Sequence, residues 1–178
     1  MRMTAILLAI LTLPLAADEV PHDLDKIEAA LKSAPDDPLL HFEKCQALFA
    51  KGKEQEALDH AAITLQKFKA AKNNLAWMRL GWIKTKTHQL DVRFNMSAAE
   101  RAEKKDGIVR PYSFHIWTTT GEPKLVHILD FELAYLDGEV VSAAIGETTE
   151  DGHANFGIVD EKSDFATIKK KVLKIVGE

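Results

Sequence analysis

Cysteine is nearly absent from the sequence, because Cys45 is the only one among 178 residues. A single cysteine excludes an intramolecular disulfide, so packing has to stabilise the fold. Long apolar runs are also scarce. The run at residues 5–15 is about half the roughly 20 residues that a membrane-spanning helix needs. We therefore expect no membrane span.

A continuous basic surface is missing as well. The chain has 23 Lys and Arg against 27 Asp and Glu, a formal net charge of -4, and the two signs are interspersed. Binding to nucleic acid depends on clustered basic residues that neutralise phosphates. We therefore expect no nucleic-acid partner. With 46% apolar and 28% charged residues, the composition is that of a globular protein.

The first residues have the pattern of a cleaved export signal. Arg2 gives a positive start, residues 5–15 form the apolar run, and Ala16 and Ala17 precede the acidic Asp18. We expect cleavage after Ala17. No cysteine follows the apolar run, so an acylated lipoprotein cysteine has no attachment point. We expect the mature chain in the periplasm or outside the cell.

From residue 24 to about residue 105, apolar residues recur at helical spacing. Asp37 and Pro38 indicate a helix start, because an aspartate caps free amide groups and proline fits the first turn. The expected helices cover residues 38–51, 53–69 and 97–105, and Gly52 lies in the turn between the first two.

Small residues at helix contacts, a turn glycine and a W-x-x-L-G run recur in this segment in one consistent frame. They fall on Cys45, Gly52, Ala57 and the run Trp77-Met78-Arg79-Leu80-Gly81. In these features the segment resembles the tetratricopeptide repeat (TPR), a helical hairpin of about 34 residues. The resemblance implies half a repeat, one whole repeat and the first helix of another. It also implies a concave surface that holds peptides or proteins.

After Gly107 the apolar period changes from helical to alternating, which predicts strands. Asp137-Gly138 is typical of a two-residue hairpin turn. The expected strands cover residues 110–119, 124–136, 139–148 and 154–160, and a helix after Ser163 is expected to bury Phe165, Ile168, Val172, Ile175 and Val176. The predicted fold class is therefore α+β: TPR-like helical hairpins, a four-stranded antiparallel meander and a C-terminal helix.

Pairing across the Asp137-Gly138 turn predicts which side chains share a face of the sheet. The predicted pairs are Leu136 with Glu139, Phe131 with Ala144, and Asp130 with Ile145. The face with Phe131 is expected to carry the C-terminal helix, because its large residues lie beside small ones. The opposite face carries Asp130 and Glu132.

Four residues are our candidate binding residues: Asp130, Glu132, His153 and Asn155. Asp130 and Glu132 lie two residues apart on one face, where one carboxylate can raise the pKa of the other, as acid–base pairs require. A solvated face, or an ion pair with a neighbour such as Arg110, is the alternative. His153 and Asn155 lie in a glycine-flanked strand entrance, which is typical of a ligand-contacting loop or of a turn with a bulge.

Two histidine patterns are compatible with metal binding. If the Gly121 loop has three residues, His127 pairs with Trp117 and lies diagonally from His115, and two imidazoles with a carboxylate can bind zinc. The carboxylates of the next strand then point to the opposite face, which leaves this site short of ligands. His41 and Cys45, four residues apart on a helix, fit core packing better.

These patterns favour binding over catalysis, and we expect no metal or cofactor. We expect an exported interaction protein that binds a protein or peptide through its TPR-like helices and an exposed sheet face. The expected segments are a signal peptide (1–17), a TPR-like helical region (18–106) and a sheet with a C-terminal helix (107–178). Two alternatives stay open: a small metal-dependent or hydrolase-like enzyme using His115 and His127 or Asp130 and Glu132, and a small-ligand-binding module.

Overall fold

The computed structural model describes residues 23–73, 77–95, 107–136, 139–149, 152–160 and 163–178. Helices α1 (Leu24–Ser33), α2 (Pro38–Ala50) and α3 (Glu54–Ala70) come first, and helix α5 (Phe165–Ile175) comes last. Between them lie strands β1 (Trp77–Lys84), β2 (His88–Asn95), β3 (Gly107–Thr118), β4 (Leu125–Leu136), β5 (Glu139–Thr149) and β6 (Gly152–Val159). The predicted α+β class is confirmed. No described helix is long and apolar enough to cross a membrane.

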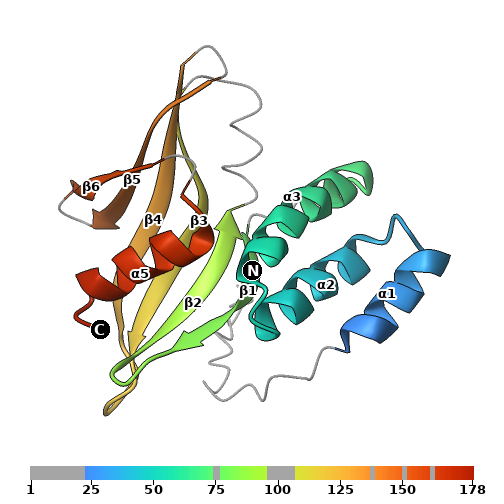
Figure 1. Cartoon of the computed structure of the whole chain (residues 1–178), viewed down its shortest axis with the longest axis horizontal. Coiled ribbons are helices and arrows are strands. Elements are labelled where there is room, and N and C mark those ends of the chain that lie inside the picture. The colour runs from blue at the N-terminus through green and yellow to red at the C-terminus, as the bar shows by residue number, and fades with distance from the viewer. Residues whose placement is uncertain (1–22, 74–76, 96–106, 137–138, 150–151, 161–162) are drawn as a thin grey trace, which may run out of the picture.

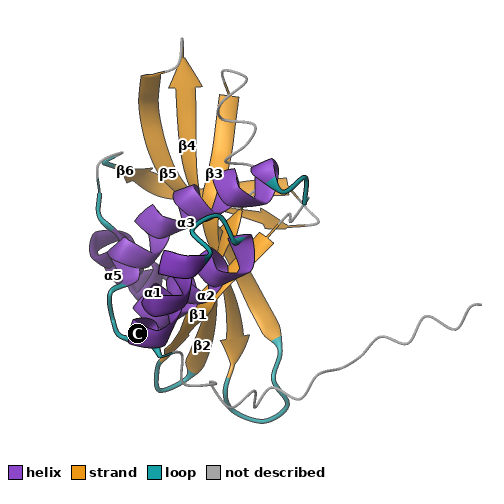
Figure 2. Ribbon diagram, turned by 90° about the vertical axis from the view of Figure 1, so that its right-hand side faces the viewer, coloured by secondary structure: helices purple, strands orange, loops and turns teal. Residues whose placement is uncertain are grey.

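The six strands form one antiparallel sheet in the order β1-β2-β3-β4-β5-β6. Each strand pairs with the next strand along the chain, so the expected meander is present with two strands more than predicted. The described helices lie on one side of this sheet (Figures 1 and 2). We call the opposite side the outer face.

The helix starts follow the capping residues that the sequence contains. The Asp37 carboxylate accepts from the backbone N–H of Leu39 at 2.8 Å, and Pro38 occupies the first turn. The Asp164 carboxylate accepts from Thr167 N in the same way at 2.8 Å, which begins α5. These caps satisfy amide groups that have no partner inside the helix. The predicted helices over 38–51, over 53–69 and after Ser163 are therefore confirmed.

The W-x-x-L-G run forms strand β1, which corrects the prediction of a third repeat-like helix there. Gly81 is required by packing, because a Cβ at this position would lie 2.4 Å from Cδ1 of Phe49. Phe49 belongs to α2 and is 5% exposed, so its ring has little room to move. The glycine that fits a repeat motif in the sequence thus lets a helix pack closely on an edge strand.

The β1–β2 hairpin also corrects the expectation that helical structure continues to residue 105. Its turn contains threonines and no glycine or proline. The Glu178 carboxylate accepts from Thr85 Oγ1 at 2.6 Å and from the backbone N–H of Thr87 at 2.9 Å. A side chain far away in the sequence therefore supplies the turn's hydrogen-bond partner, and residues 77–84 and 88–95 form strands rather than helix.

The β4–β5 pairing differs by one residue from the prediction over most of its length. Leu136 pairs with Glu139 as expected, but an irregularity between Ala134 and Tyr135 shifts the remaining pairs. Phe131 therefore pairs with Ile145, and Asp130 pairs with Gly146. A bulge of this kind moves every later side chain by one position. The helix that we expected over residues 97–105, the turn residues 137–138 and the segment 1–17 lie outside the described residues.

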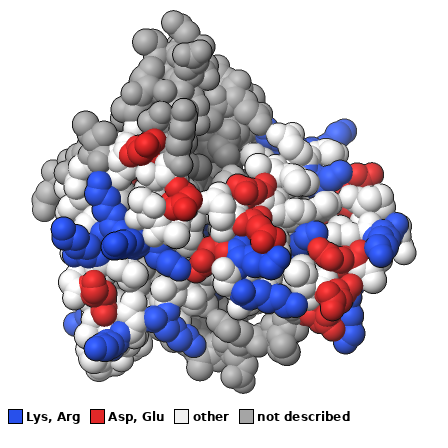
Figure 3. All heavy atoms as spheres, viewed as in Figure 1, with Lys and Arg blue, Asp and Glu red and all other residues white. Residues whose placement is uncertain are grey.

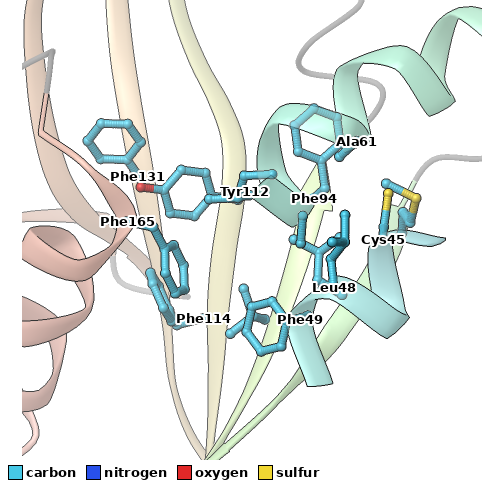
Figure 4. Close-up of a cluster of buried hydrophobic side chains, with 14 of the residues drawn as sticks. Cys45, Leu48, Phe49, Ala61, Phe94, Tyr112, Phe114, Phe131 and Phe165 are labelled. Atoms are coloured by element: carbon cyan, nitrogen blue, oxygen red, sulfur yellow. The ribbon is translucent and has the colours of Figure 1, made fainter. Parts of the chain in front are cut away.

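The core lies between the sheet and the helices, and Phe165 of α5 is at its centre (Figure 4). Its ring stacks on Phe114 with centroids 5.7 Å apart and lies 5.9 Å from the rings of Tyr112 and Phe49. Phe131 stacks on Tyr112 at 4.9 Å. Residues of α2, α3, α5 and the sheet thus belong to one hydrophobic cluster. The prediction that α5 packs on the Phe131 face is confirmed.

Charges of both signs alternate over the side of the molecule that carries α5 (Figure 3). Two polar contacts join α5 to α3 at this side. The backbone N–H of Phe165 donates to Gln55 Oε1 at 2.9 Å, and Lys169 forms an ion pair with Glu54. These contacts fix the start of α5 against the helical part of the chain.

Candidate functional site

The structure separates the two histidines that we considered as metal ligands. His127 pairs with Ile116 and His115 pairs with Ile128, so their side chains point to opposite faces of the sheet. The loop around Gly121 is longer than three residues, and Trp117 pairs with Leu125 instead of His127. Among the described residues, no three His, Cys, Asp or Glu side chains lie together as metal ligands would. A shared metal site at His115 and His127 is therefore wrong.

His127 instead lies beside Glu147, a partner that the sequence did not indicate. The His127 Nδ1 atom is 2.9 Å from Glu147 Oε1, on the helix-covered face. A histidine oriented by a carboxylate occurs in catalytic triads, where the other ring nitrogen contacts a nucleophile. In the part of the chain that the structure describes, no hydroxyl or thiol is hydrogen-bonded to His127. The pair therefore gives no support for nucleophilic catalysis.

His41 and Cys45 do not contact one another as a chemical pair. The His41 Nε2 atom donates to Pro35 O at 2.9 Å, and its Nδ1 lies 3.0 Å from His60 Nε2. The Cys45 thiol lies 3.3 Å from Thr64 Oγ1 and is fully buried. Burial raises the pKa of this thiol to about 11, which keeps it protonated. Core packing explains both residues.

Of the four predicted binding residues, Asp130 is the one whose side chain the structure describes. It is 4% exposed and lies on the outer face, where it pairs with Ser113 and Gly146. Glu132, His153 and Asn155 are placed by backbone register alone. Asn155 lies opposite Gly146, in the same row as Asp130, and His153 lies opposite Thr148. The register thus brings two of the four positions together.

That row crosses the whole sheet and is polar from end to end, apart from one glycine. Directly opposite residues of antiparallel strands share a face. The row consists of Arg79, Arg93, Ser113, Asp130, Gly146 and Asn155, one from each strand in order. One neighbouring row, on the helix-covered face, is apolar and consists of Met78, Phe94, Tyr112, Phe131 and Ile145. The polar row therefore distinguishes the outer face from the helix-covered one.

All three tryptophans of the chain lie on the outer face. Trp77 pairs with Asn95, Trp82 pairs with Asp91, and Trp117 pairs with Gln89. Trp77 is 40% exposed, which is unusual for so large an apolar side chain. Its ring meets the His115 ring edge to face, with centroids 6.2 Å apart. The outer face therefore combines large aromatic rings with polar side chains.

Two arginines converge on one buried carboxylate at the β1–β2 side of this face. Asp91 is 0% exposed. Its Oδ1 accepts from Arg79 Nε at 2.9 Å, and its Oδ2 accepts from Arg79 Nη2 at 3.1 Å and from Arg93 Nε at 2.6 Å. The Arg79 guanidinium also lies 4.8 Å from the centre of the Trp82 ring. The cluster thus holds one more positive charge than negative charge.

Three buried polar atoms beside this cluster have no hydrogen-bond partner among the described residues. They are Ser113 Oγ, His115 Nε2 and Trp117 Nε1, which alternate along β3 and so share the outer face. A buried polar atom without a partner typically costs about 1–3 kcal/mol, and such atoms are rare in folded proteins. Polar groups that contribute little to the fold are candidates for contact with a ligand.

The helical part carries a separate, smaller candidate surface. A pocket of about 320 Å³ lies among α1, α2 and α3, with Leu24, Leu48 and the exposed Ile63 as its apolar lining. Two ion pairs lie at its edge, Lys44 with Glu28 at 2.8 Å and Lys53 with Glu56 at 3.1 Å. Its size suits one or two side chains of a bound peptide.

Comparison of this chain with protein-family models, with curated proteins and with solved structures finds no match. The site therefore has to be interpreted from its own geometry. The sequence contained two signals for the outer face, the three tryptophans and the arginines near them. Neither pointed to a shared face, because Trp77, Arg79 and Trp82 had been predicted in a repeat-like helix and no strand had been predicted around Arg93.

Burial lowers the pKa of two histidines, one at each candidate surface. The pKa of His115 falls to about 4, chiefly because of burial and then because of Arg93. The pKa of His60 also falls to about 4, through burial and the neighbouring His41. Both histidines are therefore neutral at pH 7, and His115 adds no charge to the cluster around Asp91.

Acidification is expected to destabilise the protein through these two histidines. At pH values between 6.5, the usual pKa of histidine, and about 4, the pKa in the folded protein, the unfolded chain binds a proton at each histidine and the folded chain does not. The free energy of unfolding therefore decreases as the pH falls through this range. Urea unfolding at several pH values measures the decrease. A variant carrying His60→Gln and His115→Gln should lose most of it, and an equally steep decrease in that variant would contradict the assignment.

Proposed function

We propose that this protein is a binding protein whose partner is another protein or a peptide, and that the outer face is its main contact surface. The observation that carries the proposal is the gathering of all three tryptophans with Arg79 and Arg93 on one face of the sheet. Tryptophan and arginine are enriched among the residues that dominate binding energy at protein interfaces.

The edges of the sheet favour contact through the face. Strand β1 has an extra residue between Arg79 and Gly81 relative to β2, and β6 has an extra residue between Asn155 and Ile158 relative to β5. Bulges in edge strands disturb the regular row of backbone groups that another strand needs for pairing. A partner is therefore better accommodated across the outer face than along an edge.

The TPR-like helices supply a second contact surface in this proposal. The pocket among α1, α2 and α3 exposes Ile63 and is large enough for a partner side chain. The export signal that we expect at residues 1–17 would place this binding activity in the periplasm or outside the cell. Catalysis is a weaker alternative, because His115 and His127 are on opposite faces and Asp130 is almost fully buried.

Comparative capture from the envelope fraction of the parent cell tests the proposal. The baits are the unaltered protein, a variant carrying Trp77→Ala and Trp82→Ala, and the control Leu39→Ala. Leu39 lies on α2 and is 59% exposed. Its substitution also removes an exposed apolar side chain, but one that is away from the outer face. We expect the amount of protein captured by the tryptophan variant to fall about tenfold or more, as it does when residues at the centre of an interface are truncated.

The control decides how the result is interpreted. Capture of the same protein by the unaltered and Leu39→Ala baits, with loss in the tryptophan variant, supports the outer face as the contact surface. Equal capture by all three baits, or no specific capture by any of them, contradicts the proposal. An Ile63→Ala bait measures the contribution of the helical pocket.

A further inference from the structure

We infer that the outer face recognises carboxylate side chains, so that the partner contacts it with an acidic peptide segment anchored by Arg79 and Arg93. The inference rests on the proposed function and names the chemistry of the partner. It depends on the charge of this face, on the unused donors of the two arginines and on the unpartnered atoms of β3.

The described β1–β3 part of the outer face differs in the sign of its charge from the whole chain. The chain carries a formal net charge of -4. On the described outer-face side chains of β1, β2 and β3, however, Arg79, Lys84 and Arg93 oppose the single carboxylate of Asp91. Asp130 lies on the next strand and has an interaction of its own. Because His115 is neutral, this part of the face attracts negative charge.

Within the part of the chain that the structure describes, the two arginines retain donors after they have paired with Asp91. A guanidinium has five N–H donors in a planar fork. Arg79 uses its Nε and Nη2 atoms on Asp91, and Arg93 uses the same two atoms. Arg79 is 46% exposed and Arg93 is 27% exposed, so their remaining donors are accessible from outside. A planar fork matches a carboxylate better than a point charge does.

The unpartnered atoms of β3 are an independent indication of a ligand. Ser113 is 0% exposed, its Oγ has no partner among the described residues, and its backbone pairs directly with Arg93. His115, whose Nε2 also has no partner among the described residues, lies two residues further along β3, opposite Asp91. These atoms have almost no exposed surface, so an incoming carboxylate reaches them only after a shift of the side chains above them, and it then supplies the missing acceptor. The Trp77 and Trp82 rings provide apolar contact beside it.

A titration with defined peptides tests the inference on the full chain. The probe is an octapeptide of glutamate with blocked ends, and the control probe is the corresponding lysine octapeptide. Because all three tryptophans lie on the outer face, intrinsic fluorescence reports occupancy of this face, and titration calorimetry provides an independent readout. We expect the glutamate peptide to bind and the lysine peptide not to bind.

Two substitutions that remove the same charge separate specific recognition from general attraction. Arg79→Gln should weaken binding of the glutamate peptide about tenfold or more, because charge-assisted hydrogen bonds are lost. Lys84→Gln should weaken it by about twofold or less, because Lys84 is outside the cluster. Arg79→Lys should behave like Arg79→Gln, since lysine keeps the charge and lacks the fork. In each single variant Asp91 keeps Arg93 as its partner, so the fold is retained, and thermal unfolding verifies it.

Three results would overturn the inference. They are the absence of glutamate-peptide binding, equal weakening by Arg79→Gln and Lys84→Gln, and displacement of the peptide by an equal concentration of inorganic phosphate, which would indicate a general anion site. None of these results affects the capture experiment, in which Trp77 and Trp82 are changed. Failure of the inference and failure of the proposed function are therefore distinguishable.

Discussion

Replacing Phe165 with alanine is expected to lower the free energy of unfolding by about 3–5 kcal/mol, the usual range for a buried phenylalanine. The Phe165 side chain is 1% exposed. Its ring lies 5.7 Å from Phe114 of β3 and 5.9 Å from Phe49 of α2, so it joins three elements of the fold. Alanine would leave a cavity between these rings, because densely packed cores relax only partly. Urea denaturation followed by circular dichroism measures the loss.

Leu173→Ala is the matched control for this prediction. Leu173 lies on the same helix but is only partly buried against the core, so its truncation removes less contact and opens less space. We expect a clearly smaller loss than for Phe165→Ala. Equal losses in the two variants would contradict the central position of Phe165. A separate second transition in the Phe165 variant would indicate that this ring couples the helical part to the sheet.

The helices and the last four strands were predictable because their signals are local. Asp37 with Pro38 begins α2, and the alternation of apolar residues after Gly107 indicates β3 to β6. Each of these signals depends on residues that are close together in the sequence. The hydrogen bonds and burial that they predict are present in the fold.

The first two strands were missed because their signals are not local. The extra residue between Arg79 and Gly81 interrupts the alternation in β1, so that its apolar residues fit a helical motif as well. The turn that follows has none of the usual turn residues, because Glu178 satisfies Thr85 and Thr87 from the other end of the chain. Neither the extra residue in β1 nor the contact with Glu178 can be recognised from the pattern of neighbouring residues.

The same irregularities explain why the candidate site emerged only with the structure. Asp91, Arg79 and Arg93 come from two strands that were not predicted from the sequence, and Ser113 joins them through the β2–β3 register. The carboxylate that the sequence did indicate, Asp130, lies in the same polar row, one strand further on. The sequence thus pointed to the outer face through one residue, and strand pairing added the others.

Removing both arginines from Asp91 is expected to destabilise the protein by more than the sum of the single changes. Arg79→Gln or Arg93→Gln alone should cost about 1 kcal/mol, because Asp91 keeps one charged partner. The double variant leaves a carboxylate that is 0% exposed without the two cations that the described residues place beside it. Breaking a buried ion pair in this way typically costs about 3–5 kcal/mol, since the desolvated charge is no longer compensated. Urea unfolding of all three variants measures the non-additivity.

A third substitution distinguishes this electrostatic cause from lost packing. Asp91→Asn in the double variant removes the buried charge but keeps the shape of the side chain, so part of the lost stability should return. If the stability of the triple variant falls further instead, the arginines stabilise the sheet mainly by covering it with their side chains. If the single changes add up to the double change, the two arginines act independently and do not share Asp91 as a common partner.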